Sequence, residues 1–305
     1  MMPKKVELQF DLEVKLITYL WEPINEKPKA AIIIAHGMAE HILRYEDLAN
    51  FLTSKGFLVI GYDHYGHGES AISIDKIGVI EKYDFVDALI KGLKLVYDEM
   101  KEKYNLPFYL FAHSMGSIMA QRYLQLHPTD FDKVILSGVT ANSLKVRFGK
   151  YLTYLIMKFK GPISYTKLVY KMSIQPFSKP FKNEHPHYGF ISSKMDEVVK
   201  YDNNKYCGAI FPTNYYYSLT KTIIETNKKR NLKKLDPKLN IFIIGGENDP
   251  VGNYGKFAFK INNLYQQYHI LSSFKIYPEA RHECHNEKDN IKSIVYQDIY
   301  EFYRS

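Results

Sequence analysis

Short apolar runs alternate with longer amphipathic stretches along most of this chain. The runs with the length of buried strands lie at residues 30–35, 57–62, 107–111, 133–137, 240–245 and 273–277. Stretches with apolar residues at helical spacing follow most of them, at residues 45–54, 83–104, 114–126, 256–267 and 289–303. Continuous apolar strands separated by helices are typical of a parallel sheet covered on both faces. The pattern therefore predicts an α/β fold.

Two parts of the chain depart from this alternation. Residues 6–10 and 15–21 alternate apolar and polar positions, which predicts an antiparallel hairpin at an edge of the sheet. From about residue 140 to residue 236 the pattern contains no buried strand, only aromatic and lysine-rich stretches interrupted by prolines. We expect one α/β domain, made of residues 1–139 and 237–305, with an inserted helical cap at residues 140–236.

The beginning of this cap carries an apolar stripe at helical spacing. It consists of Leu144, Phe148, Tyr151, Leu155 and Phe159, with Lys145, Lys150, Lys158 and Lys160 around them. The pattern favours a helix that packs its apolar face on the core. The alternative is a lid that rests on an anionic membrane surface, or that attracts a substrate with a phosphate head group.

Composition indicates a globular protein with a large core. The chain has 305 residues, of which 46% are hydrophobic and 24% charged. Its N-terminus carries Glu7, Asp11 and Glu13 and no apolar core, so it does not read as a secretory signal. No apolar run approaches the roughly 18 residues of a membrane span. Cys207 and Cys284 suggest no disulfide framework, and we expect a reducing, cytoplasmic location, with the membrane surface as a peripheral site.

The net charge of +8 suggests a nucleic-acid partner, but the distribution of charge argues against one. Only six of the 41 basic residues are arginines, the residue on which readers of bases and phosphates usually depend. Residues 141–235 hold 18 basic residues against 5 acidic ones, whereas the remainder holds 23 against 28. The excess positive charge therefore belongs to the cap.

The sequence Ala112-His113-Ser114-Met115-Gly116 lies between a predicted strand and a predicted helix. It approximates the nucleophile elbow, G-x-S-x-G, a tight turn that lifts a serine hydroxyl above the sheet. Small residues two before and two after the serine are needed because the strand and helix backbones nearly touch. The alternative is an ordinary buried serine before a helix.

Ligands of open α/β sheets gather at the carboxyl ends of the strands. Three such ends supply Ser114, Asp249 and His282, in the order that α/β-hydrolases use. Ser114 would attack a carbonyl carbon, His282 would take and return the proton, and Asp249 would orient the imidazole. Backbone N–H groups of Met38 and Met115 would bind the oxyanion.

Other residues compete for these roles. Asp249 with Pro250 could be only a turn, and Glu247 could be the acid instead. His282 competes with His285 and with His269, which we place at the surface. The remaining candidates receive structural roles: Cys284 as a small core residue, and His64 and His67 as supports of the loop with Gly66 and Gly68 rather than as metal ligands.

Several motifs together resemble one branch of the α/β-hydrolase superfamily, that of monoacylglycerol lipases, lysophospholipases and serine aminopeptidase-like enzymes. They are HGMAEH at residues 36–41 with RY at 44–45, DHYGHGES at 63–70, HSMG at 113–116, GENDPV at 246–251 and YPEARHE at 277–283. The resemblance implies a mostly parallel sheet with helices on both faces, a helical cap after the sixth core strand, and serine ester hydrolysis without metal or cofactor. It departs at Ala112, where the elbow has glycine, and at Tyr65, where many relatives have arginine.

The resemblance also implies a substrate class, a small-molecule acyl ester such as a monoacylglycerol or a lysophospholipid. An aminopeptidase or amidase with the same three residues, and a lipid-binding relative without activity, are the alternatives. Monoacylglycerol lipases hold the glycerol head with residues that match Glu40, Arg44 and His285. The structural alternative is a local ion pair between Glu40 and Arg44, with His285 exposed to solvent.

Overall fold

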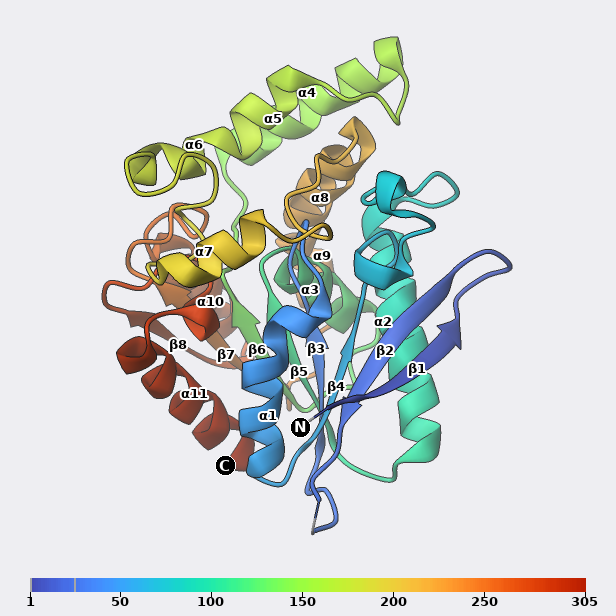
Figure 1. Ribbon diagram of the computed structural model, residues 1–305, viewed down its shortest axis with the longest axis vertical. Helices are drawn as coiled ribbons and strands as arrows, with labels where there is room; N and C mark the ends of the chain where they lie inside the picture. The colour runs from blue at the N-terminus through green and yellow to red at the C-terminus, as the bar shows by residue number, and fades with distance from the viewer. Residues whose placement is uncertain (1, 25) are drawn as a thin grey trace.

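A computed structural model describes residues 2–24 and 26–305 (Figure 1). Within them lies one sheet of eight strands in the order β1-β2-β4-β3-β5-β6-β7-β8. The strands are β1 (Lys4–Gln9), β2 (Lys15–Trp21), β3 (Ala31–Ala35), β4 (Leu58–Tyr62), β5 (Phe108–His113), β6 (Lys133–Ser137), β7 (Asn240–Gly246) and β8 (Leu271–Tyr277). β2 pairs antiparallel with β1 and β4, and every pair from β4 to β8 is parallel. The predicted α/β class and edge hairpin are confirmed.

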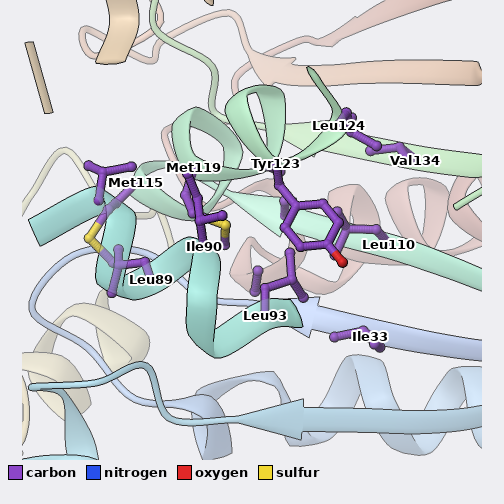
Figure 2. Close-up of a cluster of buried hydrophobic side chains, with 14 of the residues drawn as sticks. Ile33, Leu89, Ile90, Leu93, Leu110, Met115, Met119, Tyr123, Leu124 and Val134 are labelled. Carbon is purple, nitrogen blue, oxygen red and sulfur yellow. The ribbon is translucent and has the colours of Figure 1, made fainter. Parts of the chain in front are cut away.

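Helices cover both faces of this sheet. On one face lie α1 (Glu46–Ser54) and α11 (Asp289–Arg304), and on the other α2 (Phe85–Lys103), α3 (Met115–Leu126) and α10 (Lys256–Gln267). Because successive side chains of a strand point to opposite faces, Ile32 and Ile34 join the core under α1 and α11, and Ile33 joins the other core. Figure 2 shows this second core, where Leu93 of α2 and Tyr123 of α3 lie close to β3 and β5.

The chain between β6 and β7, residues 138–239, forms an insertion of helices. They are α4 (Leu144–Lys160), α5 (Lys167–Ser173), α6 (Gln175–Ser178), η4 (Lys179–Phe181), α7 (Met195–Asp202), α8 (Thr213–Thr226) and α9 (Lys229–Leu232). α8 packs on α2, on α3 and on α4. In Figure 1, α4 and α5 lie farthest from the sheet. The insertion lies where the sequence predicts a cap at residues 140–236, and its division from the core as a cap stays a prediction. None of the helices within residues 2–24 and 26–305 combines the length and the apolar character that a membrane span requires.

Short 3-10 helices complete the loops. These are η1 (Ile42–Tyr45), η2 (Gly68–Ser70), η3 (Ile74–Lys76) and η5 (Cys284–Asn286). η1, η2 and η5 lie in loops that leave the carboxyl ends of strands, η1 after β3, η2 after β4 and η5 after β8.

The apolar stripe of α4 faces solvent and not the core. Leu144, Phe148, Tyr151 and Phe159 are between 56% and 81% exposed and Leu155 is half-buried, so the interpretation that the sequence favours is wrong. Small side chains take part in the contact with α8 instead: Thr153 is the buried residue of α4, and a Cβ on Gly149 would touch Thr220. The rings of Tyr154 on α4 and Tyr217 on α8 also pair, with 6.2 Å between centroids. Periodicity shows which residues share a face of a helix, but small residues on the opposite face can make the closer contact.

Candidate active site

Ser114 alone makes the turn between β5 and α3. β5 ends at His113 and α3 begins at Met115, and Ser114 has φ 52° and ψ −115°, a conformation that residues with a side chain rarely adopt. The turn brings α3 against β3, where a Cβ on Gly116 would lie 2.3 Å from the carbonyl oxygen of Ala35. Ala112 is fully buried and pairs with Ala35, so its extra methyl group fits in the place of the elbow glycine.

The side chains of Ser114, His282 and Asp249 lie in one hydrogen-bonded row. Ser114 Oγ is 2.9 Å from His282 Nε2, and His282 Nδ1 is 3.0 Å from Asp249 Oδ2. The other carboxylate oxygen, Asp249 Oδ1, accepts the backbone N–H of Val251 at 2.8 Å. Asp249 therefore opens a turn and holds the imidazole at the same time, which combines the two roles that the sequence left as alternatives.

The environment of His282 favours the charged form of its imidazole ring, which carries a proton on both nitrogens. Burial by itself would lower the pKa of His282, but the charge of Asp249 and its hydrogen bond outweigh burial, and the pKa is raised. Asp249 is 1% exposed, so little water screens this attraction. A base with a raised pKa beside a serine hydroxyl can take a proton from that hydroxyl.

The alternative candidates lie elsewhere or are inert. Glu247 is exposed and accepts the backbone N–H of Glu279 at 3.2 Å, and His269 is exposed between α10 and β8. Cys284 is fully buried, and burial raises the pKa of its thiol well above the usual value. Cys207 is also a free thiol, and burial raises its pKa to about 12.

Met38 and Met115 lie on either side of the serine turn. Met115 is the first residue of α3, so its N–H has no carbonyl partner within the helix. Met38 follows Gly37, where a Cβ would lie 3.3 Å from the Cβ of Ser114, so the loop after β3 runs against the nucleophile. The assignment of both N–H groups as oxyanion donors stays a prediction.

Glu40, Arg44 and Glu283 form a buried ion network beside this site. Arg44 donates to the two carboxylate oxygens of Glu283 at 2.7 and 2.6 Å and also to Glu40. Glu40 further accepts the N–H of Gly37 at 2.5 Å and the hydroxyl of Tyr45 at 2.8 Å. The network therefore fixes the loop after β3 to the loop that carries His282.

The two carboxyl groups of the network respond differently to burial. Burial raises the pKa of Glu40 and exceeds the opposing effect of Arg44. Burial would also raise the pKa of Glu283, but the charge and hydrogen bonds of Arg44 outweigh it and lower that pKa. Glu40, Glu283 and His113 offer ligand atoms that lie close enough to hold a metal ion, but the guanidinium of Arg44 already supplies the positive charge there. The geometry favours a local ion network, and contact of Glu40 and Arg44 with a substrate head group stays a prediction.

His285 lies inside the protein. It is fully buried and stacks on the ring of Tyr45, with 4.6 Å between centroids, so the alternative that it is exposed to solvent is wrong. Neither ring nitrogen has a hydrogen-bond partner among the described residues. Burial lowers its pKa to about 3, which keeps the ring neutral, and its predicted contact with a head group stays a prediction.

Three supporting residues were not assigned a role from the sequence. His113 packs its ring 4.8 Å from that of His282 and is itself within 3.1 Å of Ser137 Oγ. Glu283 anchors Arg44, and Glu287 accepts the backbone N–H of Arg281 at 2.7 Å. The signal available in the sequence is their position, within five residues of Ser114 or His282. Polar and charged side chains in such a buried loop need hydrogen-bond partners.

Histidines of the neighbouring loops are neutral supports. His64 donates its backbone N–H to His36 Nε2 at 3.0 Å, and the rings of these two residues are 4.2 Å apart. Burial lowers the pKa of His64 to about 3 and that of His67 to about 4. Such uncharged, packed rings fit the structural role that the sequence predicts for His64 and His67.

Comparisons with known proteins place the chain among hydrolases. The model of a family described as serine aminopeptidase S33 matches residues 26–289. A monoglyceride lipase homolog of monkeypox virus is 30% identical over 290 residues, which are 92% of this chain and 90% of that protein. The human monoglyceride lipase is 26% identical over 285 residues, 92% of this chain and 83% of the lipase.

Among solved structures, a thermostable carboxyl esterase from Bacillus coagulans, crystallised with glycerol, has a similar fold. Its TM-score to this chain is 0.91 at 23% sequence identity, and the match covers 100% of this chain and 98% of the esterase. The likeness supports the fold that the strand order shows.

We expect Arg44→Met to reduce the free energy of unfolding by about 3–5 kcal/mol, because it leaves the carboxyl groups of Glu40 and Glu283 buried without a cation. Urea unfolding followed by circular dichroism measures this. Arg230→Met is the control, since Arg230 pairs with Glu225 at the surface and should contribute no more than about 1 kcal/mol. Equal losses in the two variants would show that the network does not stabilise the loops.

Proposed function

This chain belongs to the serine aminopeptidase S33 family of α/β-hydrolases, and from that membership we propose that it hydrolyses carboxylic esters through an acyl-enzyme on Ser114. The observation that carries the proposal is the row of hydrogen bonds from Ser114 to His282 and from His282 to Asp249, at 2.9 and 3.0 Å. A nucleophile, a base and an orienting acid in this sequence suit acyl transfer.

In the proposed acylation step, Ser114 Oγ attacks the carbonyl carbon of the ester while its proton passes to His282 Nε2. Asp249 stabilises the imidazolium through Nδ1–H, in agreement with the raised pKa of His282. The N–H groups of Met38 and Met115 bind the oxyanion. The tetrahedral intermediate then collapses, and the alcohol leaves with the proton from His282.

Deacylation repeats the same transfers with water in place of the serine. Water attacks the acyl carbon, His282 accepts a proton from the water, and the ester bond to Ser114 breaks as that proton returns to Oγ. The free acid then leaves. No other titratable group needs to act in either half of the reaction.

The proposed substrates are monoacyl lipid esters, a monoacylglycerol or a lysophospholipid. Relatives named monoglyceride lipase support this choice. An aminopeptidase would need free carboxylates near the serine to hold the amino group of its substrate. The carboxylates of Glu40 and Glu283 are both paired with Arg44, so neither is free to hold an amino group, which favours the ester over the peptide.

Ser114→Ala should lower kcat by a factor on the order of 10⁴, because no hydroxyl remains to form the acyl-enzyme. The assay compares p-nitrophenyl esters of increasing chain length with a monoacylglycerol, a lysophospholipid and an aminoacyl anilide. Ser54→Ala, at the exposed end of α1, is the control and should retain full activity. Undiminished turnover by Ser114→Ala would refute the nucleophile, and a preference for acetyl esters would refute lipid substrates but not the mechanism.

The exposed stripe of α4 supports a further part of this proposal, contact with an anionic membrane surface. Leu144, Phe148, Tyr151 and Phe159 of this stripe are exposed, and α5 also exposes Leu168 and Met172. Both helices expose lysines as well, at residues 145, 158, 160, 167 and 171. An apolar face bordered by lysines binds where acyl chains lie beneath anionic head groups. There the enzyme would meet monoacyl substrates.

Phe148→Asn with Phe159→Asn should weaken binding to phosphatidylserine vesicles, because both exposed rings are lost. Lys158→Gln with Lys160→Gln should weaken it roughly fivefold per lysine at low salt. Hydrolysis of a soluble short-chain ester should not change in either variant. Ile294→Asn on α11 and Lys4→Gln on β1, both exposed and outside the insertion, are the controls. Sedimentation that is indifferent to anionic lipid and to salt would contradict this contact.

A further inference from the structure

The loop that carries His282 is bound to the insertion by consecutive backbone hydrogen bonds. The N–H of His282 donates to the carbonyl of Phe190 at 3.1 Å, and the N–H of Glu283 donates to the carbonyl of Ile191 at 2.8 Å. Ser192 Oγ also donates to the carbonyl of Asn286 at 2.9 Å. Residues 190–192 lie in the insertion just before α7. The backbone of the candidate base is therefore bonded to a segment about 90 positions earlier in the chain.

Glu287 joins the two segments with one carboxylate. It is completely buried, and Oε1 accepts the backbone N–H of Arg281, the residue before His282, at 2.7 Å. The same carboxylate accepts the N–H of Ser193 at 3.0 Å and the hydroxyl of Ser193 at 2.5 Å. A buried carboxylate is costly unless hydrogen bonds satisfy it, and these donors come from both sides of the contact. Losing Glu287 would therefore release the two segments from each other.

The side chain of Arg281 also bonds the insertion. Its guanidinium donates to the carbonyls of Gly189 at 2.5 Å and Ser192 at 3.3 Å, and to the carboxylate of Glu184 at 2.6 Å. It also lies 4.0 Å from the centre of the Phe181 ring. The planar fork of arginine reaches these acceptors at once, which a single ammonium group cannot do.

We propose that Glu287 and Arg281 are positioning residues, which hold residues 189–193 of the insertion against the loop of His282. The imidazole then bonds Ser114 and Asp249 at the same time only while residues 189–193 lie against the loop of His282. The inference rests on the proposed function, in which His282 is the base. It also connects the insertion to the reacting groups, because a displacement of residues 189–193 would move the backbone to which His282 is bonded.

Glu287→Gln tests this proposal, because the amide replaces an acceptor oxygen with an N–H₂ group that faces the donors of Ser193 and Arg281. On a soluble short-chain ester we expect kcat to fall on the order of 10- to 100-fold, as the imidazole loses its alignment, with KM unchanged. The acidic limb of kcat/KM should also move to lower pH, because an imidazole that drifts from Asp249 loses the contact that raises its pKa. A residue with only a structural role would leave that limb in place.

Asp289→Asn is the matched control. Asp289, the first residue of α11, also bonds the insertion, through Lys194 at 3.1 Å, but its side chain is 81% exposed. The same change from carboxylate to amide at this position should alter neither kcat nor the acidic limb. Arg281→Lys should lose less activity than Arg281→Met, because one donor group remains.

Two further variants keep the outcomes distinct. If His282→Ala remains active in the same assay, the proposed function fails. If His282→Ala is inactive while Glu287→Gln retains wild-type kcat and pH profile, the positioning role fails and the mechanism stands. Thermal unfolding shows whether Glu287→Gln is folded. If it is not, Ser193→Ala, which removes one hydroxyl donor, should show a smaller shift of the acidic limb in the same direction, and an unmoved limb there overturns the proposal.

Discussion

An imidazole ring places its two nitrogens at a fixed separation, so a histidine that bonds two partners at once requires both to lie at set positions. Here the partners of His282 are Ser114 at 2.9 Å and Asp249 at 3.0 Å. They come from the ends of β5 and β7, and the histidine from the loop after β8. The parallel order of these strands brings the three ends to one edge of the sheet. The rest of the fold maintains this alignment.

Two different parts of the protein, the α/β core and the insertion, hold the residues that flank His282. Glu283 is held by Arg44, whose 3-10 helix η1 belongs to the core. Arg281 is held by the insertion and by Glu287. His282 thus lies between one support fixed to the sheet and another that belongs to the insertion. The insertion also carries the exposed apolar stripe of α4, so the same part of the chain takes part in the proposed membrane contact and in the proposed chemistry.

Sequence predicted the sheet, its edge hairpin and the meeting of Ser114, Asp249 and His282, because strand ends follow from local apolar runs and their order. It failed where a side chain's neighbours come from distant segments. The sequence pattern favours packing of the α4 stripe on the core and leaves solvent exposure of His285 open, yet the stripe faces solvent and His285 is fully buried. The contact of Glu287 with Ser193 joins residues 94 positions apart, which no local pattern indicates.

The most direct test of the account is covalent labelling by a fluorophosphonate, read by mass spectrometry of the digested protein. The reagent is attacked only by a serine whose hydroxyl is activated by a neighbouring base. The account requires one phosphonyl group per chain, on the peptide that contains Ser114, and loss of labelling in His282→Ala. Labelling at another residue, or an unchanged rate without the imidazole, would show that the row of hydrogen bonds does not activate Ser114.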